Sequence, residues 1–172
     1  MAEGLTLVTG GARSGKSAYA ERLAASHGRP VLFVATAEAR DDDMRQRIER
    51  HRAGRPAGWQ TLEEPIAVAV RLRAQYQSDA VVLVDCVTLL VSNLLLAGRP
   101  VQPEIDGLIA WQASCGATLI AVTNEVGLGI VPDNALAREY RDLLGQTNQA
   151  LAAAAGNVVL MVAGIPLAIK SA

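Results

Sequence analysis

The sequence predicts an α/β protein in three layers, with a mostly parallel central sheet between helices. Three observations support this fold class. Short apolar runs alternate with longer segments of helical periodicity, a pattern typical of right-handed βαβ units. Hydrophobic residues make up 51% of the chain and aromatic residues only 3%, so the core is aliphatic, as buried parallel strands require. A glycine-rich loop joins the first predicted strand to the first predicted helix.

The first half of the chain alternates regularly between the two kinds of element. We expect strands at residues 5–9, 31–35 and 80–85, and helices at residues 17–25, 42–53 and 66–77. The segment 54–65 contains Pro56, Gly58 and Pro65 and is predicted to be irregular.

The second half continues the pattern after a predicted buried strand. Helices are expected at residues 87–97, 104–115 and 134–155, and strands at 118–123 and 157–163, with a glycine- and proline-containing loop at 127–133. The last apolar run, 165–170, follows a strand closely and is predicted to return as an antiparallel edge strand. A chain of 172 residues is most simply a single domain, 1–172.

The loop after the first strand has the sequence of a phosphate-binding loop. It reads GGARSGKS and consists of Gly10, Gly11, Ala12, Arg13, Ser14, Gly15, Lys16 and Ser17. Glycine lets the backbone approach a polyphosphate, the lysine reaches the β and γ phosphates, and the Ser17 hydroxyl is placed to ligate Mg²⁺. A plain strand-to-helix turn is the alternative, but such a turn needs neither the lysine nor the serine. The motif therefore predicts a P-loop NTPase fold.

Asp85 ends the apolar run of the third predicted strand. Because parallel strands end at one edge of the sheet, Asp85 is expected near Ser17 and is the second candidate ligand of Mg²⁺. The alternative is that Asp85 caps the helix that begins at Val87.

An arginine-rich segment surrounds His51. Arg45, Arg47, Arg50, Arg52 and Arg55 lie within eleven residues of sequence around this histidine. Composition favours an amphipathic helix with Met44, Ile48 and His51 on one partly buried face. The chemical alternative is an imidazole that attacks a nucleotide phosphate, with the arginines stabilising the charge on the transferred group. His27, near a predicted helix end, is interpreted as a capping residue.

Composition limits the classes of partner. A net charge of −1 gives no reason to expect nucleic acid. The two cysteines predict neither a disulfide framework nor a metal site, and polar residues interrupt the most apolar stretches, so no membrane span and a cytoplasmic location are expected. The Asn-Lys-x-Asp signature that reads guanine in switch proteins is missing, since Thr123-Asn124-Glu125-Val126-Gly127 lacks the lysine after the asparagine and the acid two residues later.

Several motifs, in order along the chain, resemble those of one family. They are Gly10 to Ser17, Val34-Ala35-Thr36-Ala37, Arg47 to Arg52 followed by Gly54-Arg55-Pro56 and Trp59, Val84-Asp85-Cys86-Val87-Thr88, and Val122 to Pro132. The combination resembles the bifunctional adenosylcobinamide kinase/adenosylcobinamide-phosphate guanylyltransferase family of cobalamin biosynthesis.

The resemblance implies two reactions and a set of site residues. Adenosylcobinamide is phosphorylated by ATP or GTP, and its phosphate then receives GMP from GTP through a covalent GMP-histidine on His51. Lys16 and the rest of the phosphate loop bind the phosphates. The further nucleotide contacts implied are Ala35, Thr36, Ala37, Arg52, Ala53, Gly54, Arg55, Glu63 and Asp85. The resemblance also implies a homo-oligomer, with a trimer expected.

Two alternatives remain at this point. The chain could be a monofunctional small-molecule kinase in which His51 is structural, or a nucleotide-sensing interaction protein without turnover. Glu63, implied to read the guanine edge, could equally be an exposed loop acid.

Overall fold

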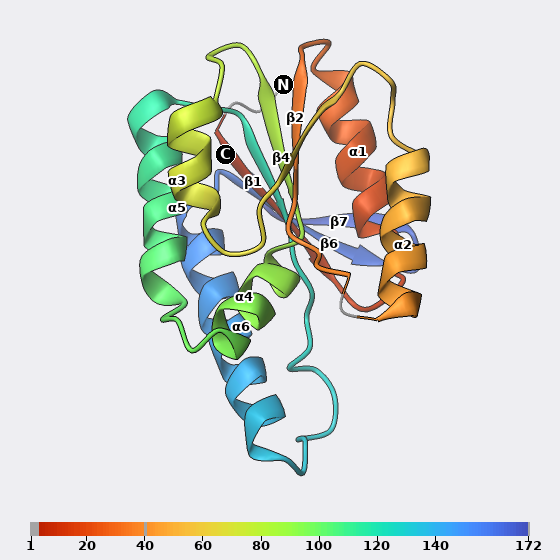
Figure 1. Ribbon diagram of the computed structural model, residues 1–172, viewed down its shortest axis with the longest axis vertical. Helices are drawn as coiled ribbons and strands as arrows, with labels where there is room; N and C mark the ends of the chain where they lie inside the picture. The colour runs from red at the N-terminus through yellow and green to blue at the C-terminus, as the bar shows by residue number, and fades with distance from the viewer. Residues whose placement is uncertain (1–3, 40, 172) are drawn as a thin grey trace.

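The structure, a computed structural model, describes residues 4–39 and 41–171, and within α2 it leaves the side chains of Asp43 and Arg47 undescribed. These residues form one seven-stranded sheet in the order β3-β2-β4-β5-β1-β6-β7 (Figure 1). Every neighbouring pair is parallel except β6 and β7, which are antiparallel at one edge. The predicted fold class and the antiparallel edge strand are therefore confirmed.

The elements follow the predicted alternation. The strands are β1 (Leu5–Gly10), β2 (Val31–Ala35), β3 (Gln60–Glu63), β4 (Val81–Asp85), β5 (Leu119–Val122), β6 (Asn157–Val162) and β7 (Ile165–Lys170). The helices are α1 (Lys16–Ser26), α2 (Asp42–Ala53), α3 (Val68–Gln75), α4 (Val87–Leu96), α5 (Gln102–Cys115) and α6 (Ala135–Ala154).

The helices cover the two faces of the sheet unequally. Figure 1 shows α1 and α2 on one face and α3, α4, α5 and α6 on the other. Successive strand residues point to opposite faces, so Val82 and Val84 of β4 pack in the larger core while Val81 and Leu83 pack toward α1. All four are fully buried, and burying an aliphatic side chain of this size contributes roughly 1.5–3 kcal/mol.

Strand β3 corrects the prediction of an irregular segment at 54–65. It pairs with β2 in parallel register, with Leu32 opposite Gln60 and Ala35 opposite Glu63. Its sequence, Gln-Thr-Leu-Glu, contains no apolar run that would indicate a strand, and only Leu62 of the four residues is buried. The hydrogen-bonding edge of β2, far away in sequence, determines that these residues are extended.

Helix α3 is shorter than its predicted range of 66–77. Glu64 Oε1 accepts hydrogen bonds from the backbone N–H groups of Ile66 and Ala67, at 3.1 and 2.9 Å. Glu104 Oε1 of α5 accepts from the N–H of Ala69 at 2.7 Å. Two carboxylates thus satisfy the free donors of the helix start, as expected from the positive end of the helix dipole.

The topology brings six strand ends together. The carboxyl ends of β1 to β6 lie along one edge of the sheet, where the chain leaves toward α1, α2, α3, α4, α6 and β7. None of the helices in the described part of the chain is long and apolar enough to cross a membrane.

Candidate functional site

The phosphate loop is shaped by two glycines that no other residue can replace. Gly10 has φ +146°, and a Cβ at this position would lie 2.4 Å from the carbonyl oxygen of Met161 on neighbouring β6. Gly15 has φ +92° and is the N-cap of α1. A side chain at either position would strain the backbone, so the loop can approach an anion only with glycine there.

Lys16 lies over the loop rather than in solvent. Its side chain is 8% exposed, and its Nζ donates to the carbonyl oxygen of Gly11 at 2.5 Å and to Ser14 Oγ at 3.4 Å. The turn between β6 and β7 supports the loop from the other side, because Gly164 N–H donates to the Ser14 carbonyl at 3.0 Å. The ammonium group is therefore held where a polyphosphate would bind.

Two neighbouring cavities lie beside the phosphate loop and share part of their walls. One, of about 690 Å³, is lined by residues 12–18 of the loop and by Arg50 and His51 of α2. The other, of about 320 Å³, lies between α2 and the ends of β2, β3 and β4. Both cavities share Ser17, His51, Asp85, Cys86 and Asn124. A nucleotide with its phosphates at the loop can therefore extend its nucleoside into the smaller cavity.

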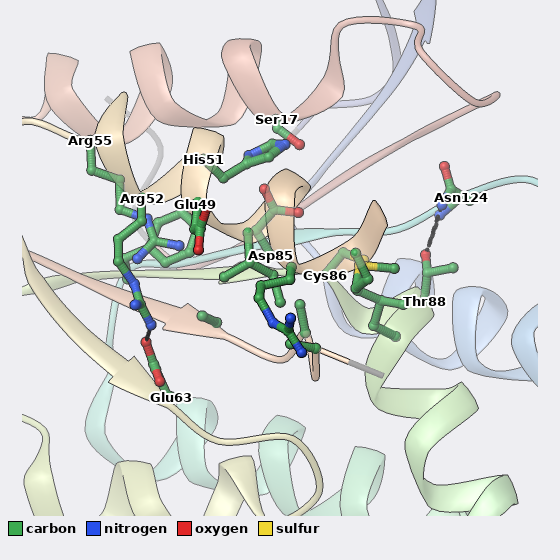
Figure 2. A pocket seen from close by; sticks show the side chains of 18 residues that line it. Ser17, Glu49, His51, Arg52, Arg55, Glu63, Asp85, Cys86, Thr88 and Asn124 are labelled. Atoms are coloured by element: carbon green, nitrogen blue, oxygen red, sulfur yellow. Dashed lines mark hydrogen bonds and ion pairs between the residues drawn. The ribbon is translucent and has the colours of Figure 1, made fainter. Parts of the chain in front are cut away.

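Ser17, His51 and Asp85 come from three different elements and lie together at the centre of the site (Figure 2). Asp85 does not cap α4, because Cys86 is the N-cap of that helix and makes no side-chain capping bond. A hydroxyl and a carboxylate suit Mg²⁺, which keeps several water and phosphate ligands. Across the described residues, no cluster of three or more His, Cys, Asp or Glu side chains could hold a metal without such ligands.

Helix α2 turns its apolar side toward the smaller cavity. Asp41 caps the helix by accepting from Met44 N–H at 2.7 Å. Met44, Ile48 and His51, the face predicted from the sequence, all line that cavity. None of these three side chains is fully buried. The face that the sequence predicted to be partly buried is so, and it borders an open site where the imidazole can reach a ligand.

The far end of the smaller cavity is lined by charged side chains. Arg52 of α2 forms an ion pair with Glu63 at the end of β3. The Arg55 guanidinium stacks on Phe33, 3.9 Å from the ring centroid, and its Nη1 donates to Thr61 Oγ1 at 3.2 Å. The Arg55 Nε is buried and has no hydrogen-bond partner among the residues that the structure describes. Since unpaired buried donors are rare, this atom indicates a ligand acceptor in the cavity.

Glu21 lies close to the site, one helical turn after Ser17 on α1. Burial raises the pKa of its carboxyl and Asp85 raises the pKa further, while His51 and Arg55 partly offset the shift. Burial also lowers the pKa of the Arg55 guanidinium, and neighbouring Arg52 lowers it further. A carboxylate on α1 thus interacts electrostatically with the basic end of α2. The spacing of four residues from Ser17 is the sequence signal for Glu21.

The structure groups most, but not all, of the predicted site residues. Those lining the cavities are Ala12, Arg13, Ser14, Gly15, Lys16, Ser17, Ala35, Ala37, His51, Arg52, Arg55, Glu63 and Asp85. Gly10, Gly11, Thr36, Ala53 and Gly54 are not among the lining residues. Thr36 is fully buried, and its hydroxyl donates to the Cys86 carbonyl at 2.8 Å and accepts from the Cys86 N–H at 2.9 Å. It therefore fixes the segment that follows Asp85.

Sequence reasoning missed Asn124, which lines both cavities from the end of β5. Its backbone N–H and its Nδ2 donate to Thr88 Oγ1, at 2.9 and 3.2 Å. Asn148 of α6 donates to the Asn124 carbonyl at 2.9 Å, and the Tyr140 hydroxyl, whose pKa burial raises to about 12, donates to the Thr88 carbonyl at 3.3 Å. The sequence signals were a polar residue at a strand end and its place in the Val122 to Pro132 motif.

These motifs and this geometry agree with the comparison to known families. The sequence model of the family described as cobinamide kinase / cobinamide phosphate guanyltransferase matches residues 6–169. The chain belongs to this family. The curated relatives include "Bifunctional adenosylcobalamin biosynthesis protein CobP" of Pseudomonas aeruginosa, 46% identical over 95% of this chain and 96% of the relative. "Bifunctional adenosylcobalamin biosynthesis protein CobU" of Escherichia coli is 44% identical over 96% of this chain and 99% of its own.

Solved structures with low sequence identity show the same fold. The flagellar accessory protein FlaH from Methanocaldococcus jannaschii has a TM-score of 0.57 at 14% identity and is matched over 98% of this chain and 78% of its own. The RadB recombinase has a TM-score of 0.51 at 16% identity, over 91% of this chain and 73% of its own. The predicted P-loop NTPase fold is therefore confirmed.

Membership of the cobinamide kinase / cobinamide phosphate guanyltransferase family settles the coarse function. The protein is a bifunctional transferase of cobalamin biosynthesis that acts as a kinase and as a guanylyltransferase. Family membership excludes a nucleotide sensor without turnover and a kinase with a single activity. The family also fits a nucleotide substrate at the phosphate loop.

Proposed function

We propose that a single domain, 1–172, carries out both reactions, with His51 as the covalent carrier of GMP. The observation that carries this proposal is the position of His51, which lines both cavities and lies between the phosphate loop and the cavity on the α2 side. A histidine with a purely structural role would have no reason to be on the wall that both cavities share.

In the guanylyl transfer, an imidazole nitrogen of His51 attacks the α-phosphorus of GTP. The bond between that phosphorus and the oxygen bridging to the β-phosphate breaks, and pyrophosphate leaves with the electron pair. The imidazole loses its N–H proton to solvent and becomes a phosphoramidate. A phosphate oxygen of adenosylcobinamide phosphate then attacks the same phosphorus, the N–P bond breaks, and the imidazole regains a proton. Adenosylcobinamide-GDP is the product.

In the kinase step, the hydroxyl oxygen of adenosylcobinamide attacks the γ-phosphorus of ATP or GTP. The bond to the β–γ bridging oxygen breaks, the nucleoside diphosphate leaves, and the hydroxyl proton passes to solvent. The transition state for phosphoryl transfer is loose, so positioning and charge stabilisation matter more than a strong base. Lys16 and the loop N–H groups supply the positive charge and the donors that this step requires.

Mg²⁺ fits the site through Ser17 and Asp85, with the remaining ligands from phosphate oxygens and water. When bound, it neutralises charge on the phosphates. Arg13, on the wall of the larger cavity, is also placed to offset the charge of departing phosphates. Asp85 has a second role that needs no metal, because its carboxylate partly offsets the lowering of the Arg55 pKa.

The smaller cavity is proposed to hold the guanosine. Its residues include Ala35 and Ala37 at the end of β2, with Arg52, Arg55 and Glu63 at the far end. Glu63 now pairs with Arg52 but has the geometry to accept from N1–H and N2–H₂ of guanine, and the unpaired Arg55 Nε is a donor for an acceptor on the nucleotide. Thr36, Ala53 and Gly54 are proposed to act through the backbone or by supporting these side chains.

We also propose a homo-oligomer, with a trimer expected. The alternating residues Ile165, Leu167 and Ile169 of edge strand β7 are exposed, and unpaired strand edges with apolar side chains favour association between copies. Multi-angle light scattering measures the mass. Because nucleoside triphosphates are the substrates, we expect the enzyme in the cytoplasm, and its net charge of −1 gives no attraction to nucleic acid.

Incubation with GTP labelled at the α-phosphate tests the nucleophile. Wild-type protein should gain a label that is labile in acid and stable in alkali, as expected of a phosphoramidate, and His51→Ala should gain none. His27→Ala, which removes the other histidine of the chain, is the matched control and should keep the label. GTP labelled at the γ-phosphate should leave the histidines unlabelled.

The proposal fails if wild-type protein binds GTP without gaining the α-label, or if His51→Ala retains it. Kinase turnover should survive in His51→Ala, since that step does not use the imidazole. Equal loss of both activities in a folded His51→Ala protein would contradict the separate roles.

A further inference from the structure

A loop outside the nucleotide cavities displays an unusual number of apolar side chains to solvent. Between the end of β5 and the first turn of α6, Leu128 is 85% exposed, Ile130 97%, Val131 61% and Leu136 51%. Val126 is also exposed. Single exposed apolar residues are ordinary, but five within eleven residues of sequence indicate a contact surface.

This loop begins inside the catalytic site. Asn124, near its start, lines both cavities, and Figure 1 shows the chain leaving the end of β5 and running away from the sheet to the start of α6. The next residue, Glu125, is joined to the phosphate-loop strand, because its N–H donates to the Gly10 carbonyl at 3.2 Å and its Oε1 accepts from Thr9 Oγ1 at 2.7 Å. The base of the loop, at Asn124 and Glu125, is therefore joined to the catalytic site, while its apolar part extends away from the sheet.

The loop is fixed at both ends, although its apolar side chains lie in water. At its start, Asn148 Nδ2 donates to Glu125 Oε1 at 3.2 Å as well as to the Asn124 carbonyl. At its end, Arg138 Nη1 donates to the carbonyls of Pro132 and Asp133, at 3.0 and 2.8 Å, and Asn134 caps α6 through Ala137 N–H at 2.8 Å. A fixed backbone that holds apolar side chains in water can bind a ligand with little further loss of conformational entropy.

We propose that this surface, Val126 to Leu136, binds the corrin ring of the cobinamide substrate. The inference rests on the proposed function, because it requires the γ-phosphate to lie at the phosphate loop. A corrinoid is a broad macrocycle with apolar faces and a hydroxyl at the end of one flexible arm. The described cavities suit a nucleotide, so the ring has to remain outside them while the arm reaches inward past Asn124.

The site explains how one protein can select its acceptor. The apolar loop contacts the faces of the ring, and the Asn124 side-chain amide, which donates to Thr88 Oγ1 at 3.2 Å, is the first polar group that the arm meets. An amide can hydrogen-bond to the attacking hydroxyl of adenosylcobinamide in the kinase step. It can also hydrogen-bond to the phosphate of adenosylcobinamide phosphate in the guanylyl transfer.

The test measures corrinoid binding directly. Equilibrium dialysis of adenosylcobinamide against the full-length protein, with a non-hydrolysable ATP analogue present, follows the absorbance of the corrin. The double variant Leu128→Ser/Ile130→Ser should weaken corrinoid binding about ten- to hundredfold and raise the kinase KM for cobinamide by a similar factor. Because both side chains are exposed, the variant should fold normally.

Val70→Ser is the matched control, since Val70 is 64% exposed on α3, away from the loop and the cavities. It should leave corrinoid binding unchanged. The α-labelling of His51 by GTP needs no corrinoid, so it should be equal in the loop variant and the wild type. Missing label in the wild type with weakened corrinoid binding in the variant would refute the histidine mechanism and leave the loop assignment standing.

Unchanged corrinoid affinity in the loop variant would overturn the proposal. Light scattering provides the second readout. If the loop variant loses affinity and also changes its oligomeric mass, the loop is a contact between copies and the proposal is wrong. If affinity falls while the mass stays that of the wild type, the proposal is supported.

Discussion

The phosphate loop and helix α2 supply opposite sides of one site, but the fold holds them in different ways. The loop lies between buried strand β1 and helix α1, where Lys16, Ala20 and Ala24 are buried. None of the described side chains of α2 is fully buried, and its apolar face borders a cavity. The difference shows that the phosphate loop is anchored to buried elements, whereas α2, which carries the proposed nucleophile His51, is attached to the core by few contacts.

This contrast suits two reactions that need different phosphorus atoms. A fixed loop can hold the β and γ phosphates for the kinase step. A helix joined to the sheet by the exposed Arg52–Glu63 ion pair can adjust its position without disturbing the core, because weakly packed elements have low local free energies of opening.

The largest effect expected is on stability. Leu7→Ala, in β1 beside the phosphate loop, should lower the free energy of unfolding by about 2–5 kcal/mol, because Leu7 is 1% exposed in the core. Ile48→Ala, on the cavity side of α2, should lower it by less than about 1 kcal/mol. Urea unfolding measures both. Equal losses would show that α2 is packed as firmly as the loop.

The next largest effect is expected on the rates of both reactions, from a change to Lys16 in the phosphate loop. Lys16→Met keeps the aliphatic stem and removes the ammonium that lies on the Gly11 carbonyl. Both reactions should slow by about 10²- to 10³-fold, as for loss of one group that stabilises transition-state charge. Steady-state kinetics with each acceptor checks this. Loss of the kinase alone would mean that the guanylyl transfer does not use the loop.

A smaller effect is expected where α2 meets the sheet. Arg52 and Glu63 are both more than half exposed, so their ion pair should couple by no more than about 1 kcal/mol in a double-mutant cycle on stability. The Glu63→Gln variant should instead raise the KM for GTP more than that for ATP, since Gln offers guanine one acceptor and no charge. An equal rise for the two nucleotides would argue against a guanine contact.

The smallest effect is expected on the pH dependence of stability, from Glu21, which interacts with both Asp85 and the basic end of α2. The pKa of Glu21 is raised in the folded protein, so its contribution to stability is present at acidic pH and is lost as pH rises from its ordinary value of 4.5 through the raised value. Glu21→Gln should therefore exceed the wild type in Tm at pH 7, by less than about 2 °C, and lose this advantage near pH 4. Thermal unfolding at the two pH values measures it.

The degree to which the site was predictable follows the same division. Gly10 to Ser17 form a local motif in which neighbouring residues shape the loop, so the sequence predicted its conformation. Asp85 was predicted because strand ends share an edge. Strand β3 was missed since its pairing with β2 depends on partners about 28 residues away, as Leu32 and Gln60 illustrate. Asn124 and Glu21 were missed because their importance depends on tertiary neighbours.

The sequence by itself determined the alternation of strands and helices, the phosphate loop and the residues that carry the family resemblance, since these depend on periodicity and short-range chemistry. Only the tertiary structure decided that the apolar face of α2 lines a cavity, that Thr36 supports Cys86 and that the loop after β5 displays its apolar side chains. The physical reason is that the burial of a side chain depends on which elements pack against it. The strand order determines those elements, and it joins segments that are distant in sequence.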